Sequence, residues 1–286
     1  MAPARAAGRT WHERAFLASR LSTGVSTTRK SRRTSTSSRY QPEQEGRPVH
    51  IESISYEVDG IGMTGHLAYD DNRKGTRPGV LLAHEGPGLD PHVKGRAERL
   101  ATLGYCAFAL DYLGAGEPVR DVQQTMERLA PLMADPAVPR RRGLAGLDIL
   151  LDQQTSDGAR IACIGYCFGG TVALEIARSG ADVQAVVGFH PGLTTSPDSH
   201  RIKAPVLMCV GTDDPLLPLE ARVAFEQDMK DAGVADWRLD VYGGVGHSST
   251  NRDVDEMGIP GVAYHERADA RSWASMLGLF SETIDG

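Results

Sequence analysis

The sequence predicts an α/β protein in which a mostly parallel central sheet is covered by helices on both faces. Two observations support this fold class. Apolar runs of strand length alternate with segments of helical spacing through most of the 286 residues, which is the pattern of repeated βαβ units. Polar, glycine-rich stretches follow directly after several of these runs. In a parallel sheet such stretches meet at the carboxyl edge of the strands, where ligands bind.

The expected strands are short apolar runs bounded by turn residues. The first two are joined by Asp59-Gly60, a dipeptide suited to a tight hairpin, and the fifth runs directly into a cysteine, Cys167. The strands are expected at residues 50–56, 61–69, 77–84, 105–110, 161–166, 183–189, 204–210 and 237–242.

The expected helices lie between these strands and at the end of the chain. The helix before the cysteine strand has leucines at positions 144, 147, 150 and 151, which is helical spacing, and the last helix is amphipathic. The helices are expected at residues 95–103, 119–133, 139–154, 168–179, 218–232 and 262–284.

Composition divides the chain into residues 1–46 and one domain at 47–286. The first 40 residues hold nine basic residues and one acid, a net charge of about +8, and the rest holds 22 basic and 36 acidic residues. We expect the Arg/Ser/Thr-rich head to be disordered. An unstructured extension or a wrongly chosen start codon explains it more simply than an organellar transit peptide, which it also resembles. The acidic body argues against nucleic-acid binding, and no apolar run is long enough to span a membrane.

The four cysteines lie in or beside apolar strand-like runs and do not form a disulfide framework. Three of them are explained as small buried hydrophobic residues, and Cys167 alone stands at a strand-to-helix turn. A reactive thiol would oxidise outside a reducing compartment, so we expect a cytoplasmic location.

Cys167 lies in the pattern Gly-x-Cys-x-Gly between a strand and a helix. This is the pattern of a nucleophile elbow, in which side chains at Gly165 and Gly169 would collide with neighbouring backbone. Phe168 opens the following helix, so its backbone N–H is predicted to contribute to an oxyanion hole. Taken alone the pattern also fits a small residue packed in a strand.

An acid and a base follow in the order that a catalytic triad on this fold requires. Asp213 and Asp214 follow the strand at 204–210, and His247 follows the strand at 237–242. Asp214 is favoured because it stands three residues after Gly211 and four before a proline, whereas Asp213 would cap the turn or face solvent. The alternative for His247 is a loop histidine that binds backbone.

The turn after the strand at 77–84 is expected to supply the second oxyanion donor, the Gly86 N–H. Glu85, beside it, would be costly to bury unless it is functional or paired with an arginine.

At this point the chain resembles the dienelactone hydrolase family of the α/β-hydrolase superfamily over residues 49–282. The motifs that carry the resemblance are Gly-Tyr-Cys-Phe-Gly-Gly at 165–170, His-Glu-Gly-Pro-Gly-Leu at 84–89, Gly-Tyr-Cys-Ala-Phe-Ala-Leu-Asp-Tyr at 104–112 and Tyr-Gly-Gly-Val-Gly-His-Ser at 242–248. The resemblance implies a triad of Cys167, Asp214 and His247, and a Glu85 that interacts with the thiol. It also implies an oxyanion hole of Gly86 and Phe168 N–H groups.

The expected reaction is attack of Cys167 on a lactone or activated ester to form a thioester, which water then hydrolyses. No metal or other cofactor is expected, because no His or Cys pair has ligand-like spacing. A general esterase or thioesterase, and a non-catalytic binding module, are the alternatives.

Pocket residues are harder to predict than the triad. His190 and Tyr112 end strands and are candidates to line the pocket, as is Arg252, five residues after His247. Five further arginines are more simply explained as exposed helix charge than as carboxylate ligands: Arg120, Arg128, Arg140, Arg141 and Arg142.

Overall fold

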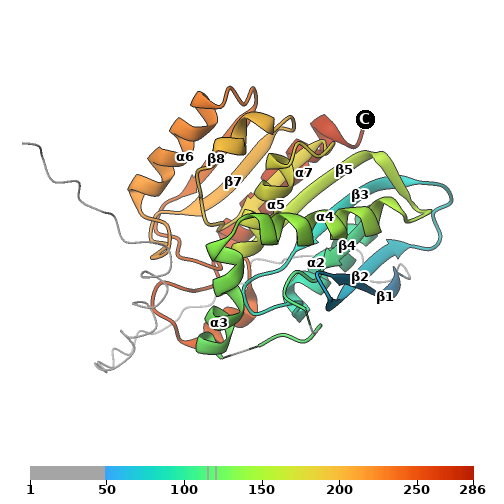
Figure 1. Cartoon of the computed structure of the whole chain (residues 1–286), viewed down its shortest axis with the longest axis horizontal. Coiled ribbons are helices and arrows are strands. Elements are labelled where there is room, and N and C mark those ends of the chain that lie inside the picture. Colours follow the sequence, from blue (N-terminus) through green and yellow to red (C-terminus); the bar gives the residue numbers. More distant parts are fainter. Residues whose placement is uncertain (1–48, 115, 120) are drawn as a thin grey trace, which may run out of the picture.

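The computed structural model describes residues 49–114, 116–119 and 121–286, so the predicted extension at 1–46 and Arg120 lie outside the described residues. One sheet of eight strands runs through the molecule in the order β1-β2-β4-β3-β5-β6-β7-β8 (Figure 1). β1 and β2 pair antiparallel, as do β2 and β4, and every other pair is parallel. The strands are Val49–Val58, Ile61–Asp70, Arg77–Ala83, Cys106–Leu110, Ser156–Tyr166, Ala185–Phe189, Val206–Gly211 and Trp237–Tyr242.

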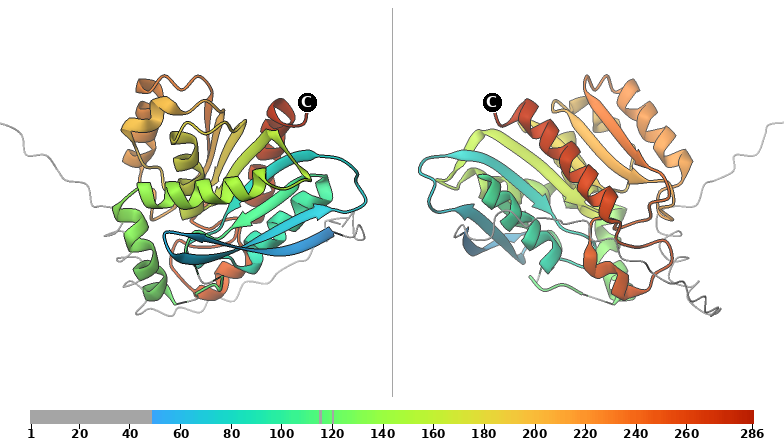
Figure 2. Two further views of the ribbon diagram at one scale, coloured as in Figure 1. Left: turned by 45° about the vertical axis from the view of Figure 1, so that its right-hand side comes forward. Right: turned by 180° about the vertical axis from the view of Figure 1, so that it is seen from behind.

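Helices cover both faces of the sheet, which confirms the predicted fold class. α4, α5 and α6 lie on the face toward the viewer in Figure 1, and α2 and α7 cover the opposite face, seen from behind in Figure 2. The helices are α2 Pro91–Leu103, α3 Val122–Ala134, α4 Ala137–Leu151, α5 Phe168–Arg178, α6 Leu219–Asp231 and α7 Glu266–Thr283, with short 3-10 helices η1 Pro197–Arg201 and η2 Arg252–Met257.

Side chains alternate between the two faces of the sheet along the central strands, which explains why helices cover both faces. In β3, Leu81 packs into the core on the α5 side, whereas Val80 and Leu82 pack into the core on the α2 and α7 side. Successive strand residues point to opposite faces, so a strand that is apolar at every position needs helices on both. All seven residues of β3 are buried.

The predicted hairpin turn is confirmed. Asp59 and Gly60 both have positive φ, 55° and 75°. They connect β1 to β2, and the residues on either side of them, Val58 and Ile61, pair with each other. A two-residue turn with positive φ at both positions matches the twist of the strands that it joins.

Two helices begin at different residues from those expected. α2 begins at Pro91 rather than at residue 95, because the Asp90 side chain accepts a hydrogen bond from the Val93 N–H and proline suits the first helical position. α7 begins at Glu266 rather than at residue 262. The segment before α7 pairs instead with His247, whose N–H donates to the carbonyl of Gly261.

The helices of the described ranges include none with the length and apolar character needed to cross a membrane.

Candidate active site

Cys167 stands on a strained turn between β5 and α5. Its φ and ψ are 52° and −122°, a backbone conformation that costs a non-glycine residue energy and is often found at functional sites. A Cβ on Gly165 would meet the carbonyl oxygen of Gly169, and a Cβ on Gly169 would meet the carbonyl oxygens of residues 83 and 84. The steric requirement predicted for these two glycines is therefore confirmed.

The thiol is the one partly exposed cysteine of the described residues. Cys106, Cys163 and Cys209 are buried, and burial raises the pKa of each of these thiols. Cys167 is half-buried and lines a cavity. Of the four cysteines, Cys167 is therefore the one that is partly exposed and lines a space that could hold a substrate.

His247 connects the thiol to a carboxylate. Its Nε2 atom lies 3.1 Å from Sγ of Cys167, and its Nδ1 atom lies 2.7 Å from Oδ2 of Asp214. The side chain of Asp214 is fully buried and that of His247 is 6% exposed. The other carboxylate oxygen of Asp214 accepts a hydrogen bond from the Leu216 N–H at 2.8 Å. Three side chains from three loops thus form one chain of contacts.

Asp213 points elsewhere. It is exposed and accepts a hydrogen bond from the hydroxyl of Thr212 at 2.8 Å. Of the two carboxylates that the sequence left in competition, the structure brings Asp214 to the imidazole.

Two glycines allow the His247 loop to reach the thiol. A Cβ on Gly246 would meet the Gly261 carbonyl, and a Cβ on Gly211 would meet the carbonyl of Val245. The loop after β8 is therefore packed backbone against backbone, which holds the histidine between the ends of β5 and β7.

The surroundings of His247 favour its protonated form. Burial lowers the pKa of His247, but the neighbouring Asp214 carboxylate and Cys167 outweigh burial and raise that pKa well above its ordinary value. An imidazole that holds a proton this firmly stabilises a thiolate beside it.

Glu85 is buried at the edge of the same cavity without an arginine partner among the described residues. Its Oε2 atom accepts a hydrogen bond from Nδ2 of Asn251 at 2.5 Å, and its Oε1 atom has no hydrogen-bond partner in the described part of the chain. Burial, aided by the nearby Asp90, raises the pKa of Glu85. The structure places Glu85 beside the cavity with Cys167, but the sulfur contacts His247 and the carboxylate contacts Asn251.

The two predicted oxyanion donors belong to segments next to Cys167 or to the wall of the same cavity. Phe168 is the first residue of α5, and Gly86 lies in the turn after β3, on the cavity wall. Within the described ranges no hydrogen bond to the Gly86 N–H is found. A Cβ on Gly86 would press on Leu129 and Thr125 of α3, which accounts for glycine there.

The cavity at the thiol has a volume of about 420 Å³ and mostly apolar walls. α3 and the segment that follows His247 form much of it, and these two stretches, far apart in sequence, lie side by side in Figure 1. Its apolar lining residues are Pro87, Pro91, Pro118, Val122, Met126, Leu129, Pro215, Leu216, Val254, Met257, Ile259 and Val262.

The three expected pocket residues are not among those that line this cavity. Tyr112 is fully buried, where its hydroxyl donates to the carbonyl of His84 at 2.9 Å. His190 is buried as well, and its Nδ1 atom lies 3.1 Å from the backbone nitrogen of Cys167. Arg252 is exposed and its guanidinium lies 4.5 Å from the ring centre of Tyr264. A residue at the end of a strand can therefore support the turn from behind instead of facing the substrate.

The expectation of exposed helix charge is wrong for Arg140 and Arg142. Arg140 binds the carboxylates of Glu175 and Asp198, and Arg142 is buried and donates to the Tyr112 carbonyl at 2.7 Å. None of the described arginines lines the cavity at the thiol.

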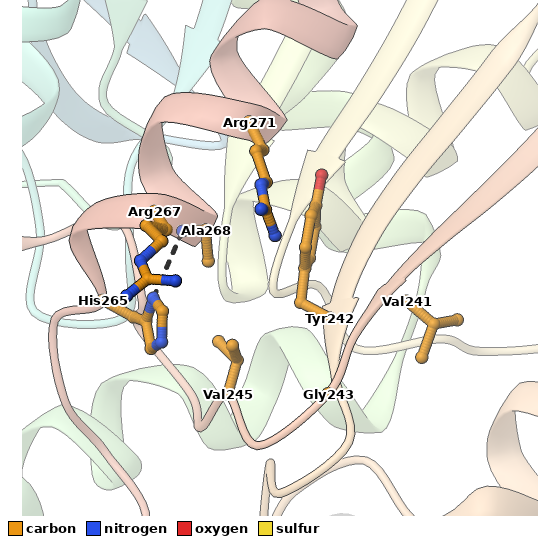
Figure 3. Close-up of a pocket in the computed structure, with 8 residues that line it drawn as sticks. All are labelled: Val241, Tyr242, Gly243, Val245, His265, Arg267, Ala268 and Arg271. Carbon is orange, nitrogen blue, oxygen red and sulfur yellow. Dashed lines mark hydrogen bonds between the residues drawn. The ribbon is translucent and has the colours of Figure 1, made fainter.

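A second hollow, of about 380 Å³, lies between β8 and the start of α7. Figure 3 shows Arg271 of α7 beside Tyr242 and Arg267 beside His265, which accepts a hydrogen bond from the Ala268 N–H. Its lining does not include Cys167, Asp214 or His247, so it is not the candidate active site.

Residues 248–251 form part of the site that the sequence did not reveal. Asn251 binds Glu85, and the Thr250 hydroxyl lies 2.9 Å from Nε2 of His190. Both side chains are buried. The only sequence signal was an unusual run of four small polar residues directly after His247.

Comparison with known proteins agrees with the fold and the motifs. A sequence model of the dienelactone hydrolase family matches residues 63–284. A Salmonella typhimurium protein, provisionally described as a carboxymethylenebutenolidase, is 29% identical over 237 residues, which is 78% of this chain and 84% of that protein.

Solved structures show the same similarity. A dienelactone hydrolase-like promiscuous phosphotriesterase from metagenomic libraries is 38% identical, with a TM-score of 0.78 over 82% of this chain and 98% of the other. A structure named m3DLH is 40% identical, with a TM-score of 0.80 over 84% of this chain and all of the other.

Proposed function

The chain belongs to the dienelactone hydrolase family, whose members hydrolyse lactones and esters, and we propose that it does so with Cys167 as the nucleophile and a thioester intermediate. The observation that carries this proposal is the chain of contacts from Asp214 through His247 to the sulfur, at a cavity wall. Nucleophile, base and orienting acid within hydrogen-bond reach of one another are the arrangement of acyl-transfer catalysis.

Acylation begins with transfer of the thiol proton to Nε2 of His247. The thiolate attacks the carbonyl carbon of the substrate, and the negative oxygen is held by the N–H groups of Gly86 and Phe168. Collapse of the tetrahedral intermediate expels the alkoxide, which takes the proton from His247. A lactone ring opens at this step, and the acyl group remains on sulfur as a thioester.

Deacylation uses the same groups. His247, now neutral, removes a proton from water, and the hydroxide formed attacks the thioester carbonyl. The sulfur leaves and recovers its proton from His247, and a carboxylic acid is released. Asp214 keeps Nδ1 protonated throughout, so that Nε2 stays the atom that exchanges protons.

Glu85 supports formation of the thiolate in this proposal. Its raised pKa means that it holds a proton more readily than an ordinary glutamate, so it is suited to exchange a proton near the sulfur as substrate enters.

The test compares wild type with Cys167→Ala and with Cys209→Ala, a matched loss of a buried thiol. p-Nitrophenyl acetate should be hydrolysed by wild type and Cys209→Ala but not above background by Cys167→Ala. Brief exposure of wild type to a slow acyl donor should add one acyl group to the peptide that contains residue 167, seen by mass spectrometry. Equal rates for all three proteins would refute the mechanism.

A second candidate activity is cleavage of uncharged phosphotriesters, since one 38% identical relative is a promiscuous phosphotriesterase and the cavity walls are apolar. Release of p-nitrophenol from paraoxon that depends on Cys167 would support it, and activity unchanged in Cys167→Ala would exclude it.

A further inference from the structure

Three donors surround the carbonyl oxygen of Glu85, in the turn that carries the predicted oxyanion donor Gly86. Nδ1 of His84 lies 2.6 Å from this oxygen, and the Gly88 N–H donates to it at 3.1 Å. The Tyr112 hydroxyl, which donates to the His84 carbonyl at 2.9 Å, also reaches the Glu85 oxygen at 3.3 Å. A carbonyl oxygen only accepts hydrogen bonds, so Nδ1 of His84 carries the proton in its contact.

The carbonyl of Glu85 belongs to the same peptide unit as the Gly86 N–H. No cis peptide bond occurs in the described chain, so the C=O and N–H of this planar unit point in opposite directions. Donors that hold the Glu85 oxygen therefore turn the Gly86 N–H away from the buried His84 ring. Gly86 lines the cavity with Cys167, and within the described ranges its N–H has no hydrogen-bond acceptor. This N–H is thus available to a substrate oxygen.

The fold confines the His84 ring in the position that this contact needs. His84 follows β3 and Tyr112 follows β4, two neighbouring parallel strands that end side by side (Figure 1). Both side chains are fully buried, and their rings are stacked with centres 3.9 Å apart. On the other side of the imidazole, Nε2 lies 3.8 Å from Oδ1 of Asp111. The ring therefore lies between a phenol, a carboxylate and the Glu85 carbonyl.

The same turn packs against the nucleophile elbow. A Cβ on Gly169 would meet the carbonyl oxygens of residues 83 and 84, so the two backbones are in close contact there. Gly169 follows Phe168, whose N–H is the other predicted oxyanion donor. The backbone of His84 is thus next to both segments that are predicted to hold the oxyanion.

Resting on the proposed function, we propose that His84 is a positioning residue for the oxyanion hole. Its Nδ1–H orients the Glu85–Gly86 peptide so that the Gly86 N–H meets the negative oxygen of the tetrahedral intermediate, and the Tyr112 hydroxyl assists. This role is separate from activation of the thiol, because among the described residues His84 makes no hydrogen bond to Cys167 or His247.

The first experiment compares His84→Phe, which removes the donor, with His84→Asn, whose side-chain amide can donate to the same carbonyl. With p-nitrophenyl acetate, kcat of His84→Phe should fall by about tenfold or more while KM changes by less than about threefold, since loss of an oxyanion donor lowers kcat by about a hundredfold or more and a misdirected donor costs less. His84→Asn should recover most of the loss. Tyr112→Phe, which keeps the ring and removes the hydroxyl, should lower kcat by about threefold.

His66→Phe is the matched control. His66 is also a buried histidine, but its Nε2 atom lies 3.1 Å from a carboxylate oxygen of Glu98, and it does not line the cavity. Its kcat should equal that of wild type. Unfolding of each variant by urea shows whether its fold is intact.

The second experiment separates positioning of the oxyanion from formation of the thiolate. Iodoacetamide alkylates Cys167 by displacement of iodide from a saturated carbon, and no oxyanion forms. Its rate in His84→Phe should therefore lie within about twofold of wild type, because no oxyanion needs to be stabilised. Trifluoroacetophenone instead receives the thiolate at its carbonyl carbon and leaves a negative oxygen in the oxyanion hole. Protection of Cys167 from iodoacetamide should need about tenfold more of this ketone in His84→Phe than in wild type.

These outcomes distinguish the inference from the proposed function. If no ester is hydrolysed but the ketone protects wild type and the shift in protection occurs, the proposed function fails and the role of His84 stands. Unchanged kcat and unchanged protection in His84→Phe would refute that role, as would equal losses of hydrolysis and alkylation, or a ketone that does not protect wild type. If His84→Phe does not fold, Tyr112→Phe is measured in the same two assays, and a wild-type kcat with wild-type protection would overturn the inference.

Discussion

Replacement of Asp214 by asparagine tests whether this carboxylate supports the charged form of His247. The two side chains are buried and in contact at 2.7 Å, which puts the centres of their charges about 4 Å apart. With an effective dielectric constant of about 20, Coulomb's law gives about 4 kcal/mol for this pair. The imidazolium is needed when the thiolate attacks, so the loss should appear in the barrier as a decrease of about a thousandfold in kcat/KM.

The assay is hydrolysis of p-nitrophenyl acetate at neutral pH, with Asp213→Asn as the matched variant one residue away. Asp213 is exposed, and among the described residues its side chain accepts a hydrogen bond only from its neighbour Thr212, so its replacement should change kcat/KM by less than about threefold. Unfolding by urea, followed for both variants, separates loss of catalysis from loss of fold. A larger defect in Asp213→Asn, or a loss below about tenfold in Asp214→Asn, would show that the electrostatic argument is wrong.

Three further predictions follow from the same structure. Burial raises the pKa of Asp111, but His84 and the backbone N–H groups of Leu113 and Gly114 outweigh burial and lower that pKa to about 2. The ionised carboxylate therefore stabilises the folded state above pH 4, and this contribution is lost as the pH falls toward 2. Asp111→Asn should therefore be less stable than wild type by about 2 kcal/mol at pH 7 and about half that at pH 3, in urea denaturation; equal midpoints at pH 7 would contradict this. Gly165→Ala should abolish activity because its methyl group would meet the Gly169 carbonyl, whereas Gly62→Ala, with nothing within 4 Å, should behave as wild type; an active Gly165→Ala enzyme would exclude a rigid elbow. A chelator should leave ester hydrolysis unchanged, and inhibition that added metal reverses would rule out the metal-free mechanism.

The hairpin, the parallel sheet and the elbow were predictable because each depends on neighbouring residues. Asp59-Gly60 adopts positive φ because glycine has no Cβ and aspartate tolerates this conformation, and the elbow glycines are required by the turn in which they stand. The start of α2 was also readable, since Asp90 and Pro91 form an N-terminal signal that the prediction of a helix from residue 95 overlooked.

The start of α7 could not be read in the same way. The residues from 262 onward have helical spacing, but the N–H of Ala263 donates to the carbonyl of His247, on a segment that precedes it by a loop. A contact between two loops overrides local helical preference, because a backbone group that is bonded there cannot also join the helix.

The sequence by itself determined which side chains are available for chemistry and in what order, since a thiol between two glycines, a carboxylate loop and a late histidine each follow a strand. The tertiary structure alone decided which aspartate meets the imidazole, which residue binds Glu85, and that Tyr112 and His190 support the site from behind. The physical reason is that the distance between two side chains, and the direction in which each one points, depend on how separate loops pack together. The spacing of residues along one segment does not contain that information.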